Sequence, residues 1–284
     1  MRILVTGASG LIGKSLIKNL SAHEVIDIRK IRTKHNSLLL DFSKEWSIND
    51  LPSSIDTIIH LAQSRNFRKF PLAAEEIYSV NTLSTAKLLN YAQSTGVKNF
   101  IYASTGGIYK PKNSLLKEDS HLLPIGELSF YFTSKLNSEM LCNAYSEILN
   151  TTIIRPFFVY GPNQSSDMLI PRIFNSVKNS TPVLLAGNEG ISINPIFVED
   201  AAKFIVGIVE REIRGVFNLA GNEILSLKKI TERVSSLLDK EAIFKSSIES
   251  PNLVANIDNL LNYFPNFAWT PFDEGMERTW KALK

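Results

Sequence analysis

The sequence predicts an α/β fold in which a doubly wound parallel sheet is followed by a small C-terminal lobe. Short apolar segments alternate with segments of helical periodicity through the first half of the chain, a pattern typical of a parallel sheet with helices on both faces. After Arg155 the segments become shorter and more mixed, and prolines interrupt them. The length of 284 residues is sufficient for a main domain and a smaller one.

The first strand is predicted at Arg2–Thr6, a short apolar segment rich in branched side chains. A helix is expected next, because apolar residues recur at helical spacing from Leu11 to Leu20. The link from Ile31 to Leu40 is too short for a good helix, so that crossover should be reduced. Later strands are predicted at Glu24–Ile28, Ser37–Leu40, Thr57–Leu61, Asn99–Ala103 and Thr151–Ile154.

Two longer helices are predicted, at Ala73–Thr95 and Ser129–Leu149. On the second helix, Tyr131 and Lys135 are four residues apart and therefore share a face. We expect that face to lie off the main core face. The apolar stripe expected to face the core consists of Leu136, Met140, Leu141, Ala144, Tyr145 and Ile148.

The C-terminal half is expected to return once to the sheet. Ile193–Glu210 predicts a strand followed by a helix, Gly215–Gly221 predicts another strand, and the tail resembles helices and loops. We assign residues 1–158, with 193–214 returning, to the main domain that carries the sheet. Residues 159–192 and 215–284 form a smaller lobe in this interpretation.

Composition limits the classes of function. The net charge of +3 is small and spread along the chain, so it gives no indication of a nucleic-acid surface. No apolar run reaches the roughly 18 residues of a membrane helix, and no charged-then-apolar leader precedes the first strand. We therefore expect neither membrane insertion nor secretion. The single cysteine, Cys142, permits no internal disulfide and fits a reducing, cytoplasmic compartment.

The cysteine and the histidines give no sign of metal or thiol chemistry. Cys142 lies in a helical pattern, where a small buried apolar role is expected rather than that of a nucleophile. His60 ends an apolar strand and is expected to be a hydrogen-bonded structural residue. No metal-ligand spacing is present among the four histidines, His23, His35, His60 and His121.

Three glycines, Gly7, Gly10 and Gly13, lie where the first strand turns into the first helix. Glycine lets backbone N–H groups approach a ligand closely, and a helix N-terminus favours anions. This arrangement predicts a pyrophosphate cradle and a Rossmann-like sheet. The alternative is a tight strand-to-helix turn that binds nothing.

Hydroxyl groups follow the predicted strand Asn99–Ala103. Ser104 and Thr105 lie at its carboxyl end, where open α/β sheets place their ligands. The helix that comes next carries the Tyr131-x-x-x-Lys135 pair. The alternative is a solvated helix pair. The order of glycine turn, strand-end hydroxyls and Tyr-x-x-x-Lys favours a catalytic role over that alternative.

This combination resembles the extended short-chain dehydrogenase/reductase family, in its NAD(P)-dependent nucleotide-sugar epimerase/dehydratase branch. The resemblance covers nearly the whole chain. It rests on "TGASGLIG", "LLLDF", "HLAQS", "VNTLSTAKLL", "YASTGGIY", "YFTSK", "RPFFVYGP", "INPIFVEDAA" and "FNLAG", which follow one another in family order.

The resemblance implies a cofactor site and a catalytic site. Asp41 would hydrogen-bond the adenine, with Phe42 beside it, and Ala62 would lie along the cofactor. Lys135 would hold the nicotinamide ribose. The glycine-turn residues Gly7, Gly10, Leu11, Ile12 and Gly13 would line the pyrophosphate.

The same resemblance makes Tyr131 the acid/base and Thr105 the hydrogen-bond partner of the reacting oxygen. A tyrosine titrates near pH ~10, so its pKa must be lowered by about 3 units for work near neutrality. The Lys135 ammonium and an oxidised nicotinamide ring could together supply that shift.

The sequence departs from the family pattern in three places. Gly106 and Gly107 stand where the family's dehydratases carry an acidic pair, which disfavours dehydration. Phe158 replaces an asparagine, and Ile193 and Asn194 replace an arginine that grips the diphosphate. A nucleotide-diphosphate sugar remains the leading substrate class, and Arg172 could supply part of the missing charge.

The choice between NAD and NADP stays open, with a lean to NADP. An acidic residue ending the second strand favours NAD, whereas an arginine suits the phosphate of NADP. Alignment with the family places Arg29, not Asp27, at the deciding position, with Lys30 and Arg32 nearby. A solvated basic loop is the alternative interpretation.

The function predicted from the sequence is that of an NAD(P)-dependent oxidoreductase or epimerase acting on a nucleotide sugar through a keto intermediate. The alternatives are a reductase of a non-nucleotide carbonyl compound and a non-catalytic dinucleotide sensor. The expected partner is a small-molecule substrate, with no nucleic acid and no membrane. A homodimer is compatible with the sequence.

Overall fold

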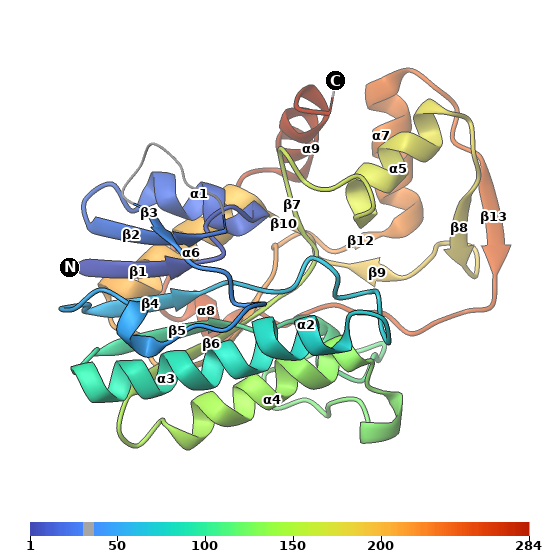
Figure 1. Ribbon diagram of the computed structural model, residues 1–284. Coiled ribbons are helices and arrows are strands. Elements are labelled where there is room, and N and C mark those ends of the chain that lie inside the picture. The colour runs from blue at the N-terminus through green and yellow to red at the C-terminus, as the bar shows by residue number, and fades with distance from the viewer. Residues whose placement is uncertain (31–36, 284) are drawn as a thin grey trace. The chain divides into compact units, whose positions relative to one another are not determined.

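The computed structural model describes residues 1–30 and 37–283. Its centre is a seven-stranded sheet with the strand order β11-β6-β5-β4-β1-β2-β3 (Figure 1). The pairings from β6 through β5, β4, β1 and β2 to β3 are all parallel, which confirms the predicted doubly wound α/β class. The strands are β1 (Arg2–Thr6), β2 (Glu24–Arg29), β3 (Ser37–Leu39), β4 (Thr57–His60), β5 (Asn99–Ala103), β6 (Asn150–Pro156) and β11 (Gly215–Leu219).

The strand order reverses between β1 and β4. The chain runs from β1 outward to β2 and β3, and then returns to place β4 on the other side of β1. Ligands of doubly wound sheets bind at such a reversal, outside the carboxyl ends of the strands. Arg32 and most of the predicted reduced crossover from residue 31 to residue 40 lie outside the described residues.

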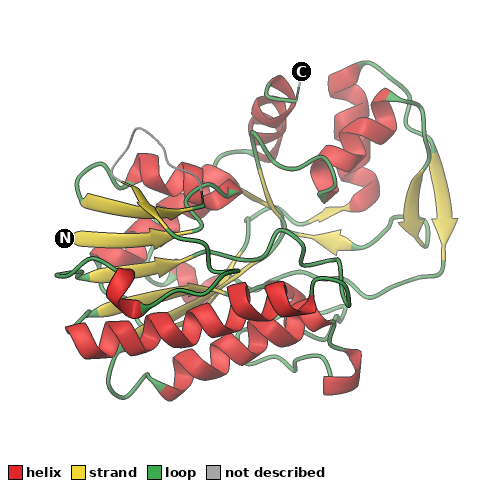
Figure 2. Cartoon of the chain, in the orientation of Figure 1, coloured by secondary structure: helices red, strands yellow, loops and turns green. Residues whose placement is uncertain are grey.

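Helices cover both faces of the sheet, as Figures 1 and 2 show. α3 and α4 lie along one face, and α1 lies on the other. Their bounds are α1 (Leu11–Asn19), α2 (Ala74–Tyr78), α3 (Ser84–Thr95), α4 (Phe130–Ala144) and α6 (Val198–Glu210). Short 3-10 turns span Ile48–Asp50, Gly106–Ile108 and Ile125–Glu127.

The predicted helix Ala73–Thr95 is interrupted by a π-helical turn over Ser79–Leu83 that joins α2 to α3. Asn81 within this turn is 1% exposed, and its side chain bonds both Ser64 and Ser134. Single π-helical turns of this kind occur frequently at functional sites.

The prediction for α4 was wrong in two respects. The helix ends at Ala144, not at Leu149, because the Tyr145 N–H closes a turn onto the carbonyls of Leu141 and Cys142. Its buried face is also different: Ser134, Lys135, Ser138, Glu139 and Cys142 are buried, although Leu141 and Tyr145 of the predicted stripe do pack against the core. In the predicted core stripe, by contrast, Met140 is 62% exposed and Ile148 is 67% exposed.

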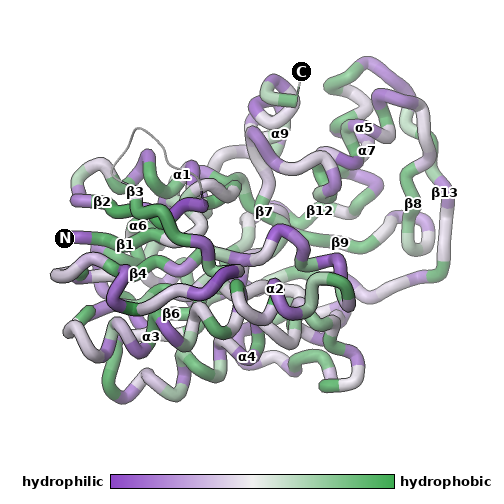
Figure 3. The backbone as a smooth tube through the Cα atoms, viewed as in Figure 1, coloured by the Kyte–Doolittle hydropathy of each residue, from purple (hydrophilic) through white to green (hydrophobic). Residues whose placement is uncertain are grey.

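Polar partners explain why the buried face of α4 carries polar residues and differs from the predicted one. The Ser138 hydroxyl donates to the Asn81 carbonyl at 2.8 Å, and Arg155 pairs with Glu139 at 2.7 Å. Hydrogen-bonded polar groups can therefore occupy the sheet-facing side. Figure 3 shows hydrophobic and hydrophilic residues alternating along both α3 and α4. The burial of Cys142, 0% exposed, is confirmed.

One continuous core lies between the sheet and α3. Leu4, Ile58 and Phe100 come from three adjacent strands, and Leu88 and Leu89 come from α3. All five side chains are fully buried. Burial of this apolar surface is the main stabilising contribution for the sheet.

The chain divides into two compact units. The first comprises residues 1–108, 122–156 and 202–217, and the second comprises 109–121, 157–201 and 218–284. The domain assignment made from the sequence stays a prediction. In the second unit, Phe197 and Phe272 pack against Tyr160 at ring distances of 5.6 and 5.2 Å.

The tail was predicted as helices and loops, and this was incomplete. It contains β13, whose four residues pair in parallel with β8, because Phe244 to Ser247 lie opposite Val183 to Ala186. The second unit contains β7 (Val159–Tyr160), α5 (Leu169–Lys178), β8 (Val183–Ala186), β9 (Ser192–Ile193), β10 (Ile196–Phe197), β12 (Leu225–Ser226), α7 (Leu227–Leu238), β13 (Phe244–Ser247), α8 (Asp258–Leu261) and α9 (Phe272–Lys281). Across residues 1–30 and 37–283, no helix has the length and apolar character needed to cross a membrane.

Candidate active site

The candidate site lies at the carboxyl edge of β1, β4 and β5. These strands are neighbours, and the register places Thr6 opposite His60 and His60 opposite Tyr102. The residues that follow the three strands therefore emerge together at one edge. They are the glycine turn after β1, the segment 61–70 after β4, and Ser104 with Thr105 after β5.

The glycine turn is tightly packed. Gly7 has φ +72°, and a Cβ there would lie 2.7 Å from the Ala62 nitrogen, so the turn requires glycine. A Cβ on Gly13 would overlap the Gly7 carbonyl. Gly10 begins α1 without a side-chain cap, which leaves the first N–H groups of the helix without an intrahelical partner. The turn thus presents backbone donors at a helix N-terminus, the arrangement that binds phosphate groups.

A buried polar frame supports this turn. The His60 ring contacts the Thr6 hydroxyl at 2.6 Å and the Thr85 hydroxyl at 3.0 Å. The Ala62 N–H donates to the Thr6 hydroxyl at 3.1 Å, which ties the segment after β4 to the end of β1. Burial, together with the Lys135 charge, lowers the pKa of His60 to about 3, so its ring is neutral. The structural, hydrogen-bonded role predicted for His60 is confirmed.

Tyr131 lies in the first turn of α4, which begins where the Ser129 hydroxyl accepts from the Phe132 N–H. Its hydroxyl donates to the Gln63 Oε1 atom at 2.9 Å. Burial raises the pKa of Tyr131, and the neighbouring Thr105 hydroxyl and the Arg68 charge oppose that rise. Thr105 and Tyr131, paired on sequence grounds, therefore lie near enough for Thr105 to lower the Tyr131 pKa.

Segment 61–70 also packs on the phenol ring. The Phe67 ring lies 4.8 Å from the Tyr131 ring, and the Arg68 guanidinium lies 5.0 Å from the centre of the Phe67 ring. On the other side, Phe132 lies 5.6 Å from Tyr131. The hydroxyl thus lies among aromatic side chains near a positive charge.

Lys135 is 1% exposed, contrary to the expectation that it lies off the core face. Its Nζ atom donates to the Ala103 carbonyl at 2.7 Å, at the end of β5. Burial lowers the pKa of Lys135 to about 7, against the opposing effect of the Glu139 carboxylate. Lys135 is buried because a backbone carbonyl and a buried carboxylate on the sheet side of the helix stabilise its ammonium group.

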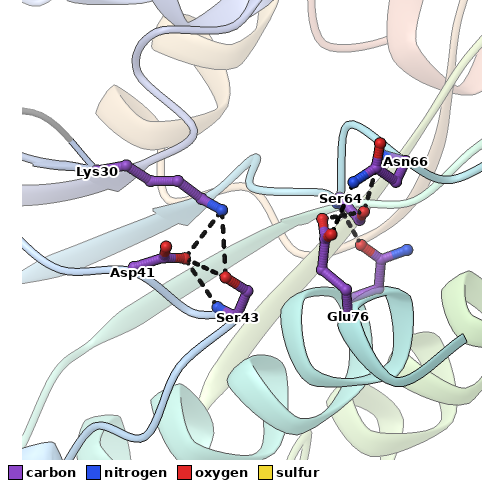
Figure 4. A network of polar contacts seen from close by, with 7 residues as sticks. Lys30, Asp41, Ser43, Ser64, Asn66 and Glu76 are labelled. Atoms are coloured by element: carbon purple, nitrogen blue, oxygen red, sulfur yellow. Dashed lines mark hydrogen bonds and ion pairs between the residues drawn. The ribbon is translucent and has the colours of Figure 1, made fainter. Parts of the chain in front are cut away.

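The residues predicted for the adenosine end are engaged in local contacts. The Lys30 ammonium lies 2.9 Å from the Asp41 carboxylate, which also accepts from the Ser43 N–H at 2.9 Å (Figure 4). Burial raises the pKa of Asp41, but hydrogen bonds from Lys30 and Ser43 outweigh it and hold the pKa below its usual value. Phe42 is 5% exposed and belongs to the hydrophobic core.

Arg29 and Asp27, the two candidates for cofactor selection, pair with each other. The Arg29 Nε–H donates to the Asp27 carboxylate at 2.7 Å. The Asp27 side chain is 5% exposed and that of Arg29 is 21% exposed. The arginine is therefore the more accessible of the two, and its orientation is fixed by the aspartate.

Sequence reasoning missed Gln63, which contacts the Tyr131 hydroxyl directly. The available signal was its position: Gln63 follows Ala62 in the "HLAQS" block, just beyond the carboxyl end of β4. Polar residues at that edge of a parallel sheet face the ligand region. Arg68 was missed as well, since no spacing rule connects it to Tyr131.

The residues present fit a dinucleotide. The glycine turn admits no side chain at Gly7 or Gly13, so only backbone surrounds the N–H groups at the start of α1, which have no side-chain cap. The Ser104 hydroxyl at the end of β5 is buried and makes no hydrogen bond within the described residues, as expected where a ligand completes the site. Fold and site together define a dinucleotide-binding protein of the doubly wound α/β class.

Comparison with known proteins agrees with this class. The model of the NAD dependent epimerase/dehydratase family matches residues 3–220, and the chain belongs to that family. The chain is 29% identical to the Bacillus subtilis protein named "Uncharacterized UDP-glucose epimerase YtcB", with 93% of each chain covered. It is 25% identical to a UDP-glucuronate 4-epimerase of Thermodesulfobacterium geofontis, covering 97% of this chain and 94% of that protein.

Among solved structures, a UDP-glucuronic acid 4-epimerase from Bacillus cereus in complex with UDP-glucuronic acid and NAD has a TM-score of 0.86. It is 24% identical, and the match covers 100% of this chain and 99% of that one. This likeness confirms the fold. The matching relatives also include a reductase and a dehydratase of dTDP-sugars.

Proposed function

We propose that this protein is an NAD-dependent epimerase or oxidoreductase that acts at a carbinol carbon of a nucleotide sugar through a keto intermediate. The observation that carries the proposal is the placement of Thr105, Tyr131 and Lys135 at the carboxyl end of β5, where Lys135 bonds the Ala103 carbonyl and Thr105 lowers the Tyr131 pKa. Family membership and nucleotide-sugar epimerases among the relatives support it.

In this proposal Tyr131 moves a proton at its hydroxyl oxygen. Thr105 hydrogen-bonds the reacting oxygen of the substrate and orients it toward Tyr131. The buried phenol has a raised pKa, so proton release requires nearby donors and positive charge. The nicotinamide, when bound, accepts a hydride and returns it.

Lys135 is proposed to bind the nicotinamide ribose. Its Nζ uses one donor on the Ala103 carbonyl and has two further N–H groups when protonated. A pKa lowered to about 7 makes the charge of Lys135 sensitive to what binds beside it at neutral pH. The carboxylate of Glu139 favours the protonated form.

Dehydration is disfavoured in this proposal. Gly107 occupies one position of the acidic pair, and a Cβ there would overlap the Phe132 ring. An aspartate or glutamate at residue 107 would therefore displace Phe132, which packs on Tyr131. Since dehydratases occur among the relatives, this part of the proposal depends on the residues of this chain alone.

The structure weakens the case that the sequence departures in the second unit make against a nucleotide-sugar substrate. Phe158 has φ +44°, a left-handed conformation that asparagine adopts readily. An asparagine at this position therefore has a backbone explanation independent of any substrate. Asn194 is buried and bonds Gly221 and Ala255, and Ile193 is fully buried. Arg172 is exposed on α5, and its contact with a diphosphate stays a prediction.

Selection of NADP over NAD is proposed to depend on Arg29, which Asp27 holds in a fixed orientation. An arginine of this kind binds a 2′-phosphate by charge-assisted hydrogen bonds. Solved structures of similar fold are complexes with NAD, so a preference for NADP depends on the residues of this chain alone and has to be measured. A cytoplasmic location and a homodimer also stay predictions.

The test is incubation of the purified protein with NAD⁺ and, separately, UDP-glucose, UDP-glucuronate and dTDP-glucose. Proton NMR is used to detect the epimer, and absorbance of the reduced nicotinamide is used to detect the keto intermediate. Epimer formation supports the epimerase. Net reduction of a keto sugar or of a simple ketone by NADPH supports the reductase. Tight cofactor binding with no turnover of any of these compounds supports the sensor and contradicts the proposal.

A further inference from the structure

The hydroxyl of Tyr131 is hydrogen-bonded to Gln63. Its O–H donates to the Gln63 Oε1 atom at 2.9 Å, within the range of a normal hydrogen bond. Gln63 is exposed on segment 61–70, while Thr105 lies at the end of β5. Gln63, which follows β4, therefore holds the phenol hydroxyl, and Thr105 is near enough to lower its pKa.

A buried chain of hydrogen bonds fixes the position of Gln63. The N–H of its neighbour Ser64 donates to the Asn81 side chain at 2.8 Å, and Asn81 donates to the Ser134 hydroxyl at 2.9 Å. Ser134 donates in turn to the Tyr131 carbonyl at 2.7 Å. Ser64, Asn81 and Ser134 are 1%, 1% and 3% exposed. Segment 61–70 is therefore tied to the turn of α4 that carries Tyr131.

A second anchor holds the same segment. The Glu76 carboxylate accepts from the Ser64 hydroxyl and from the Asn66 amide, each at 2.7 Å (Figure 4). The hydrogen bond from Ser64 is the main cause that lowers the pKa of Glu76, so Glu76 is ionised near neutrality. Charge-assisted hydrogen bonds are stronger than neutral ones. Together the two anchors fix the backbone on which Gln63 stands.

A glutamine amide can serve both protonation states of a phenol. Its oxygen accepts from the neutral O–H, and its NH₂ group donates to a phenolate after a half turn of the amide. We propose that Gln63 is a positioning residue that holds the Tyr131 hydroxyl and stabilises its phenolate by turning its amide. This inference rests on the proposed acid/base role of Tyr131.

The consequence concerns how the phenolate forms inside the protein. The turned Gln63 amide donates to the phenol oxygen, in addition to the nearby Thr105 hydroxyl, which also lowers the Tyr131 pKa. Hydrogen bonds to the charged form favour that form. The other titratable groups around the phenol are Arg68 from segment 61–70, Tyr102 from β5 and Lys135, one turn further along α4.

The test reads Tyr131 directly and needs no substrate. 3,5-Difluorotyrosine is incorporated in place of Tyr131, because its phenol is more acidic and its ¹⁹F resonance reports both contacts and protonation. The resonance is followed against pH in this protein and in the same background with Gln63→Glu or Gln63→Met. Gln93→Glu is the matched control, because Gln93 is an exposed glutamine on α3.

We expect Gln63→Glu to raise the titration midpoint by about 1 unit or more, since a carboxylate beside the phenolate disfavours it. Gln63→Met removes the donor and should raise the midpoint less, and Gln93→Glu should leave it unchanged. Both Gln63 variants should also shift the resonance near neutral pH. An unchanged midpoint in Gln63→Glu, or a resonance insensitive to both Gln63 variants, overturns the inference. Neither result bears on turnover, which tests the proposed function separately.

Discussion

Replacement of Gly10 by valine is expected to weaken the binding of NAD and NADP alike while leaving the fold intact. Gly10 has φ −74° and ψ 177°, an extended conformation that any residue adopts. An added Cβ would meet only the Gly7 carbonyl, at 3.1 Å. The folding cost should therefore be about 1 kcal/mol or less. Gly7 differs, because its φ of +72° and its contact with Ala62 make any side chain strained.

The expected loss of affinity follows from the contacts that the side chain would block. The N–H groups at the start of α1 lack a side-chain cap and are the donors offered to a pyrophosphate. Hydrogen bonds to a charged group contribute about 1.5–3 kcal/mol, so the loss of one such contact weakens binding roughly 10- to 100-fold.

Calorimetric titration with each cofactor measures the effect. Gly126→Val is the matched control, because nothing lies within 4 Å of a Cβ added at Gly126. The control should bind as the wild type does. If Gly10→Val also binds both cofactors with wild-type affinity while remaining folded, the glycines form only a turn and the reasoning is refuted.

Three further predictions follow from individual contacts. Arg29→Ala should weaken the binding of NADPH and leave the binding of NADH unchanged. Dissociation constants are measured for both cofactors. A wild-type preference for NADH that Asp27→Ala abolishes would contradict the proposed preference for NADP. The pKa of His60 is about 3 in the folded state and 6.5 in the unfolded state. Between these two pH values the folded state binds fewer protons, so the free energy of unfolding falls on acidification. His60→Gln should remove about 2 kcal/mol of the loss between about pH 7 and about pH 5, measured by urea unfolding, and an unchanged loss would contradict a neutral buried ring. Gly107→Asp should lower the free energy of unfolding by about 1–3 kcal/mol, because the new side chain displaces Phe132. NMR should detect no dehydrated product. Wild-type stability together with dehydration would show that the site tolerates an acidic residue at this position.

The sequence was sufficient for the features that depend on local pattern. The strand Arg2–Thr6, the glycine turn and the helix from Leu11 were all predicted at their observed places, because a buried parallel strand and an amphipathic helix have distinct periods. The placement of Thr105 beside the glycine turn followed from strand order, since adjacent carboxyl ends share an edge.

The features that the sequence did not predict depend on tertiary partners, which periodicity does not reveal. The buried face of α4 was misassigned because Glu139 is paired with Arg155, a residue 16 positions away. Lys135 was expected to lie off the core face for the same reason, although its partner is a carbonyl of β5. Gln63 contacts Tyr131 across 68 positions, and only the fold brings them together.

The most direct test of the central claim is turnover by Tyr131→Phe under the conditions in which the wild type converts a nucleotide sugar with NAD⁺. Tyr145→Phe, at the C-terminal end of α4, is the control with the same chemical change. We predict a loss of about 10²-fold or more in kcat for Tyr131→Phe, with cofactor binding nearly unchanged and the control as active as the wild type. Activity of Tyr131→Phe within a few-fold of the wild type would contradict the assignment of Tyr131 as the acid/base.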